Sequence, residues 1–204
     1  MTDAGREAEA GKPIGYVALT FDDGPNANTS ALLAALRSCG VRATLFNTGD
    51  NASSDPSLVA AEAAAGMWIG NHSFSHPHML TLSSDEMRDE LARTQSAIQA
   101  GGGGTPRLFR PPFGETDGRL ESVAASLGLL DMTWDVDSED WNGAGTEAIV
   151  AAADRLQDGG VMLMHDRYAT TIAAIPKIVA NLTRRGLRPG MIDPATGRAI
   201  APRA

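Results

Sequence analysis

Short apolar segments alternate with segments of helical periodicity along this chain, and this alternation limits its fold more than any other feature. The apolar segments cover residues 16–21, 42–47, 66–70, 108–110, 129–136, 160–164 and 187–192. The helical segments cover residues 29–38, 56–65, 83–100, 118–127, 146–156 and 171–185. Strands that are apolar throughout, rather than half polar, predict a parallel sheet covered by helices.

Capping residues mark the ends of these helices. Asn28 or Thr29 is predicted to cap the first helix, and Gly40 to end it. Ser83 and Glu86 have the spacing of a capping box at the start of the longest helix.

Reactive side chains follow the predicted strands directly at their carboxyl ends. They are Asp22 and Asp23, His72 and His76, Arg110, Asp140 and Trp141, and His165. Barrel enzymes assemble their sites at this end of their strands, and seven strand–helix units suit a (β/α) barrel. A doubly wound open sheet also uses strand ends and is the alternative.

Composition fits one soluble domain, because 204 residues with 43% hydrophobic content support a single sizeable core. No repeat or linker divides the chain, so residues 14–204 are expected to form one catalytic domain. Residues 1–13 are polar and lack the basic start and apolar core of a secretion signal. We expect them to be disordered or expression-derived, and the native protein to be secreted with its leader removed.

The net charge limits the classes of partner, and the cysteine count limits the disulfide bonds. The net charge of −8 argues against nucleic acid or an anionic membrane as a partner and favours a neutral or cationic one, such as a partly deacetylated glycan. Cys39 is the single cysteine, which rules out an intrachain disulfide and indicates a buried thiol.

Three of the four histidines lie between residues 72 and 78. The i, i+4 spacing of His72 and His76 would place both rings on one helix face, but Pro77 disfavours helix, so the pair is expected to hold a cation from a turn. Two imidazoles suit zinc, and a catalytic zinc site usually takes a third ligand such as a carboxylate. His78 is interpreted as a bystander, because a fourth ligand would close the site.

The pair Asp22 and Asp23 can divide two tasks. One carboxylate would bind the metal, while the other takes a proton from water. Spacing does not decide which residue does which, and an isolated Asp-Asp-Gly-Pro segment also suits a surface turn. Arg110, which could equally be an ordinary surface cation, would at the rim of a metal site pair with the base and keep it ionised and oriented.

A second proton carrier is predicted at His165, although a lone histidine at a strand end is often a core residue. With Asp140 or Asp137 beside it, His165 could be held protonated near neutral pH and act as a general acid. Trp141 would form an apolar wall of the pocket or pack in the core.

Five motifs in order resemble the polysaccharide deacetylases of carbohydrate esterase family 4, the nodulation-protein type. The motifs are Thr20-Phe21-Asp22-Asp23-Gly24, His72-Ser73-Phe74-Ser75-His76, Arg110-Pro111-Pro112-Phe113-Gly114, Asp137-Ser138-Glu139-Asp140-Trp141 and Leu163-Met164-His165-Asp166, and the resemblance covers about residues 14–200. Phe113 departs from the tyrosine common at that position. The chain is similar, within the family, to secreted actinobacterial acetylxylan esterases that also deacetylate chitooligosaccharides.

The resemblance implies a distorted (β/α) barrel of about seven strands and a role for each motif. It implies that Asp22 is the base and Arg110 its brace, and that Asp140 tunes the acid His165. The implied metal ligands are Asp23, His72 and His76, and the implied substrate-binding residues are Phe113, Trp141 and Leu163. The backbone N–H of Phe113 would face the oxyanion.

The implied activity is metal-dependent removal of acetyl groups from chitin, chitooligosaccharides and acetylxylan. One divalent ion, zinc with cobalt or nickel as substitutes, would be the cofactor, and a monomer is expected. The alternatives are a peptidoglycan N-acetylglucosamine deacetylase and a glycan-binding pseudoenzyme without turnover.

Overall fold

A curled parallel sheet forms the centre of the protein. The computed structural model describes residues 13–203. Seven strands run in the order β5-β4-β3-β2-β1-β7-β6, and β8 pairs with the start of β1, all in parallel. Their bounds are β1 Gly15–Gly24, β2 Thr44–Asn47, β3 Trp68–Asn71, β4 Leu108–Phe109, β5 Leu130–Asp131, β6 Val136–Asp137, β7 Val161–His165 and β8 Leu187–Pro189.

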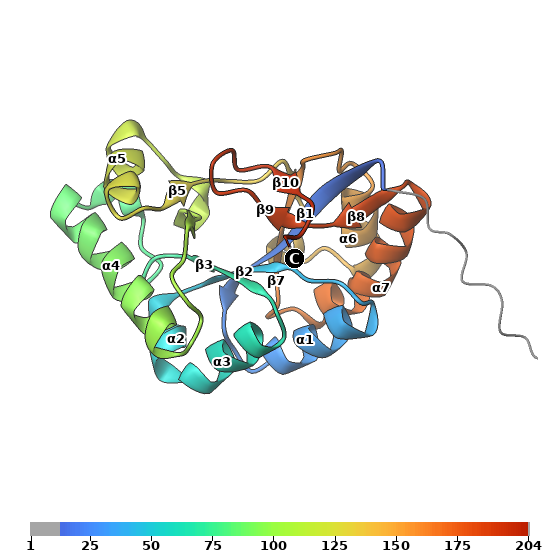
Figure 1. Cartoon of the computed structure of the whole chain (residues 1–204), viewed down its shortest axis with the longest axis horizontal. Coiled ribbons are helices and arrows are strands. Elements are labelled where there is room, and N and C mark those ends of the chain that lie inside the picture. Colours follow the sequence, from blue (N-terminus) through green and yellow to red (C-terminus); the bar gives the residue numbers. More distant parts are fainter. Residues whose placement is uncertain (1–12, 204) are drawn as a thin grey trace, which may run out of the picture.

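Helices cover the outside of this sheet (Figure 1). They are α1 Thr29–Ser38, α2 Gly49–Ser54, α3 Pro56–Ala64, α4 Ser84–Ala100, α5 Gly118–Ser126, α6 Thr146–Ala153 and α7 Ala169–Arg184, with short 3₁₀ turns η1 Met79–Thr81, η2 Pro112–Gly114 and η3 Asp140–Asn142. The predicted barrel of parallel strands is confirmed, as a half-barrel that stays open between β5 and β6. Within residues 13–203, no helix has both the length and the apolarity needed to cross a bilayer.

In strand β1, alternate side chains point to opposite faces of the sheet, and this alternation determines the direction of the Asp22 side chain. Val17, Leu19 and Phe21 pack outward into the largest apolar cluster, beneath helices such as α1 and α7. The residues between them point to the other side, where Ala18 joins a small cluster with residues of β2, β4 and β7. Asp22 has the parity of Ala18, so its side chain faces the inside of the curled sheet.

The predicted strand over residues 129–136 is wrong, because this segment forms two short strands. β5 pairs with β4 and β6 pairs with β7, so residues 132–135 cross the open seam from one edge of the sheet to the other. Asp135 stands in this crossing, and its side chain accepts from the backbone N–H of Val161. The single strand expected over residues 187–192 is also divided, into β8 and β9 Met191–Ile192, and β9 forms a hairpin with β10 Ala199–Ile200.

Local details follow the predictions in part. The capping box of Ser83 and Glu86 is present, with both reciprocal hydrogen bonds. Asn28 precedes α1 but its side chain caps nothing there, since its amide donates instead to the carbonyl of Arg167 at 2.9 Å. Cys39 is half-buried rather than buried, because it lies just beyond the last turn of α1. The predicted N-terminal segment, residues 1–13, lies outside the described residues except for its last residue, and the single-domain prediction stays a prediction.

Candidate active site

The carboxyl ends of the strands surround a cavity of about 470 Å³. Neighbouring strands bring sequence-distant residues together here: in the pairing of β1 with β7, Asp22 lies directly opposite His165. The predicted residues in its lining are Asp22, Asp23, His72, His76, Phe113, Trp141, Leu163 and His165. Parallel pairing therefore places both predicted proton carriers in one pocket.

Asp23, His72 and His76 form a group of possible metal ligands at one side of the cavity. Oδ1 of Asp23 lies 3.5 Å from Nε2 of His72 and 3.4 Å from Nε2 of His76. Tetrahedral zinc, with bonds of about 2.0–2.2 Å, holds its ligand atoms roughly 3.3 Å apart. The donor set and its spacing therefore fit a divalent ion of this kind.

The tautomer of His72 supports the same assignment. Its Nδ1 lies 2.7 Å from the carbonyl oxygen of Arg110, which can only accept a hydrogen bond. Nδ1 therefore carries the proton, and Nε2 presents a lone pair toward Asp23, as in histidines that bind metals. Burial lowers the pKa of His76, which also favours a neutral ring.

The surroundings of Asp23 favour its ionised carboxylate. Burial alone would raise the pKa of Asp23, but the imidazoles that surround its carboxylate, His72 first among them, outweigh burial and keep that pKa well below its usual range. Its backbone is in the left-handed region, with φ of 69°, and His76 has φ of 57°. Such conformations cost about 1–3 kcal/mol each and persist where the surroundings enforce them, often at functional sites.

Asp22 lies beside this group, with its Oδ2 3.8 Å from Nε2 of His72, and its other oxygen is held by Arg110. Nη1 of Arg110 donates to Oδ1 of Asp22 at 2.8 Å and to the hydroxyl of Thr20 at 2.6 Å, while Nη2 donates to the carbonyl of Thr133 at 3.1 Å. Arg110 thus pairs with Asp22, the carboxylate for which the resemblance implies the role of base. Its expected place at the rim is wrong, since Arg110 is fully buried with its guanidinium 4.2 Å from the ring of Phe46.

His165 is paired with Asp140 across the pocket. Its Nδ1 lies 2.7 Å from Oδ1 of Asp140, which also accepts from the hydroxyl of Thr171 through Oδ2. Burial disfavours the charged imidazole, yet Asp140 and the charge of Asp22 raise the pKa of His165 above its ordinary value. Of the two predicted partners the structure selects Asp140, while Asp137 accepts from the indole N–H of Trp141 at 3.2 Å.

Aromatic rings form the exposed edge of the cavity. Trp141 is 53% and Phe113 55% exposed, and the buried Leu163 lines the wall. Trp141 is thus a pocket wall and not a core residue. His78 lies outside the group of possible ligands, as predicted, and its Nδ1 is 3.0 Å from Glu115.

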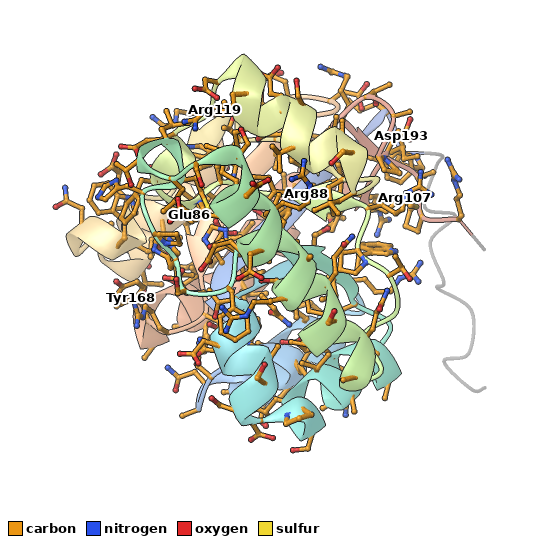
Figure 2. The ribbon with its side chains drawn as sticks, turned by 90° about the vertical axis from the view of Figure 1, so that its left-hand side faces the viewer. Glu86, Arg88, Arg107, Arg119, Tyr168 and Asp193 are labelled. Carbon is orange, nitrogen blue, oxygen red and sulfur yellow. The ribbon has the colours of Figure 1, made fainter. Side chains whose placement is uncertain are left out.

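Sequence reasoning missed three further lining residues, Trp134, Arg167 and Tyr168. Trp134 was hidden inside the predicted strand over residues 129–136. Arg167 and Tyr168 follow the end of β7, so the rule that strand ends carry the site could have found them. Figure 2 labels Tyr168, at the edge of the molecule, and Arg167 lies 3.5 Å from Oδ2 of Asp23.

The fold and donor set define a class: a curled (β/α) sheet with a candidate metal site at the carboxyl ends of its strands. The polysaccharide deacetylase family model matches residues 9–131. The chain is 50% identical over 190 residues to a bifunctional xylanase/xylan deacetylase of Cellvibrio japonicus, covering 92% of this chain and 29% of that protein. It is 34% identical over 189 residues to a peptidoglycan-N-acetylglucosamine deacetylase of Listeria monocytogenes, covering 90% and 39%.

A solved structure agrees. The family 4 carbohydrate esterase from Streptomyces lividans, in complex with acetate, superposes with a TM-score of 0.92 at 57% identity, covering 94% of this chain and 100% of that chain. The chain belongs to the polysaccharide deacetylase family. It spans between 29% and 39% of the length of the two curated relatives named above.

Proposed function

We propose that this chain is a metal-dependent deacetylase that hydrolyses acetyl groups on polysaccharides. The observation that carries the proposal is the different setting of two adjacent carboxylates. Asp22 is held by Arg110 at 2.8 Å, whereas Asp23 faces the imidazoles of His72 and His76. One acid is thereby available as a base and the other as a ligand.

Asp23, His72 and His76 would hold one divalent ion, for which we propose zinc, with cobalt or nickel as substitutes. When bound, such an ion supplies Lewis-acid polarisation of the acetyl carbonyl and lowers the pKa of water. Three protein ligands leave a coordination position open for chemistry.

The protein's own groups move the protons and receive the charge. Asp22, oriented by Arg110, takes the proton of the attacking water. The backbone N–H of Phe113 donates to the developing oxyanion, as in other sites of acyl transfer. His165, charged through its pairing with Asp140, gives its proton to the departing amine or alcohol, and acetate is released.

For the substrate we propose N-acetylated chitin and chitooligosaccharides together with O-acetylated xylan. A chitin deacetylase of Amylomyces rouxii, 32% identical to this chain over 178 residues, supports the first substrate, and the xylan deacetylase of Cellvibrio japonicus supports the second. The aromatic edge of Trp141 and Phe113 suits a sugar ring. Leu163 lies where it can pack against an acetyl methyl group. An extracellular location and a monomeric state complete the proposal.

Two alternative functions would give different results in the test of this proposal. Peptidoglycan N-acetylglucosamine would be the substrate if the chain acts like its relative from Listeria monocytogenes. A glycan-binding pseudoenzyme is disfavoured, because base, brace, acid and ligand group are all in place around one cavity.

The test is release of acetate from chitooligosaccharides, acetylxylan and peptidoglycan side by side. We expect chelation to abolish release, and added zinc or cobalt to restore it, on the first two substrates. Thermal unfolding of the chelated protein should remain cooperative, because the core depends on strands and helices and not on the ligands. Full activity in a sample that elemental analysis finds free of metal would refute metal dependence.

A further inference from the structure

Phe113 has an unfavourable backbone conformation that burial of its side chain does not stabilise. Its backbone φ is 60°, a conformation that costs a non-glycine residue about 1–3 kcal/mol. The residue is 55% exposed, so core packing does not hold it in place. Something at the surface must therefore restrain this residue.

Two histidine rings from the loop after β3 make that contact. The ring of His78 stacks on the ring of Phe113, with centroids 4.1 Å apart and an interplanar angle of 17°. The ring of His76 meets it edge-on, with centroids 4.8 Å apart. Phe113 therefore contacts a predicted ligand and the residue two positions beyond it.

His78 is itself anchored at both ends. Its carbonyl accepts from the backbone N–H of Thr81 at 3.0 Å and from the hydroxyl of Thr81 at 2.7 Å. Its Nδ1 lies 3.0 Å from Oε2 of Glu115, two residues past Phe113. A side chain of the loop after β3 is thus linked both to the ring and to the backbone segment of the loop after β4.

We propose that His78 and Glu115 are positioning residues, a clamp that fixes the backbone of Phe113 relative to the metal-binding group. The inference rests on the proposed function, because it assigns to the clamp the aim of the Phe113 N–H at the developing oxyanion. On the opposite side, the Cα of Gly114 faces the ring of Trp134, where an added Cβ would meet that ring at 2.7 Å. The turn is held between Trp134 and His78.

Loosening the clamp would affect the chemical step more than substrate binding. An oxyanion donor acts on charge that develops in the transition state, so its misplacement lowers kcat. A misplacement of about 1 Å can cost on the order of 100-fold, and we expect about 10-fold in kcat from a partial loosening.

The experiment compares His78→Ala and His78→Phe in the zinc-loaded protein, with Arg88→Ala as the control. Arg88 also forms an exposed ion pair, with Asp85, and lies on α4 (Figure 2). We expect His78→Ala to lower kcat about 10-fold with KM within about twofold and zinc content unchanged. His78→Phe, which keeps a stacked ring, should recover most of kcat, and Arg88→Ala should match the parent.

A second readout does not depend on turnover. The NMR order parameter of the Phe113 amide should fall from about 0.85 to below about 0.6 in His78→Ala. An unchanged order parameter, a rise in KM alone, or loss of zinc in His78→Ala would each overturn the clamp. If the parent releases no acetate from any substrate but the order parameter still falls, the clamp stands and the proposed function fails.

Discussion

The floor and the rim of the pocket are built in opposite ways. The floor, which we define as Asp22, Arg110, His72 and Asp140, is at most 2% exposed, and each of its charged groups has a hydrogen-bonded partner. The rim is defined as Phe113, Trp141 and Arg167. Phe113 and Trp141 are each more than half exposed, and so is the side chain of Arg167. The charged groups of the proposed catalytic machinery are thus buried and paired, while the groups proposed to meet the substrate are exposed.

This contrast has an energetic reason. A buried charge without a partner is costly, and breaking a buried ion pair by removing one member costs about 3–5 kcal/mol. An exposed ion pair contributes about 0–1 kcal/mol. The floor is therefore rigid because its charges require each other, and the rim can vary with little effect on stability.

The largest effect on stability is expected from Arg110→Met. This change leaves Asp22 buried without its cation and should lower the free energy of unfolding, measured with urea, by about 3–5 kcal/mol. The exposed Arg88→Ala should lower it by less than about 1 kcal/mol. Adding Asp22→Asn to Arg110→Met should recover part of the loss. A loss below 1 kcal/mol in Arg110→Met would remove the distinction between floor and rim.

His165→Ala should cost about 10² or more in turnover while zinc stays bound, because it removes a general acid and no ligand. Amides should suffer more than esters, since an amine must be protonated before it departs. The measurement is kcat/KM on chitooligosaccharide and on acetylxylan, with bound zinc determined in the same samples. Loss of zinc in His165→Ala would show that His165 had been given the wrong role.

Glu62 is a buried acid whose side chain is hydrogen-bonded to a neutral amide, so it tests whether a buried carboxyl without a charged partner has a raised pKa. It is 1% exposed, its carboxylate accepts a hydrogen bond from the amide of Asn47 at 2.6 Å, and burial raises its pKa to about 8. The native state thus keeps a proton that the unfolded state releases above its ordinary pKa. The free energy of unfolding should fall as pH rises from about 5 to 7, by at most about 1.4 kcal/mol per unit.

The matched comparison for this slope is Glu62→Gln against Glu147→Gln. The first variant removes the titrating group and should flatten the fall in stability between pH 5 and 7, whereas Glu147 lies exposed on α6 and its substitution should leave the slope as in the parent. Equal slopes in all three proteins would mean that Glu62 ionises normally.

The smallest effect is expected at the rim. Trp141→Ala should raise KM about 10-fold, equivalent to about 1.4 kcal/mol of lost sugar contact, with kcat and unfolding free energy near the parent values. Trp141→Phe keeps an aromatic face and should lie between the two. Steady-state kinetics on a chitooligosaccharide series would measure this, and a fall in kcat with unchanged KM would place Trp141 with the floor.

Much of this arrangement could be predicted from local patterns. Continuously apolar strands indicated a parallel sheet, and parallel strands end at the same edge, so Asp22 and His165 could be expected in one pocket. The capping box of Ser83 and Glu86 could be read from spacing alone. These features depend on residues that are neighbours in sequence or on a rule common to all parallel sheets.

The remainder depends on contacts between distant segments. The depth of Arg110 follows from bonds to Thr20 on β1 and to Thr133 in the seam, neither of which its neighbouring prolines indicate. The division of residues 129–136 follows from pairing with β4 at one end and β7 at the other. The stacking of His78 on Phe113 likewise joins two loops that are distant in sequence. The position of His78 two residues after His76 therefore does not predict this contact.

The most direct test of the account applies the same substitution to two adjacent residues. Asp22→Asn and Asp23→Asn each remove one negative charge and keep the side chain's size, and bound zinc and kcat are measured in both proteins. We expect Asp22→Asn to bind zinc like the parent and lose about 10² or more in kcat, and Asp23→Asn to lose zinc as well as activity. Loss of zinc in Asp22→Asn with full retention in Asp23→Asn would contradict the assignment of base and ligand.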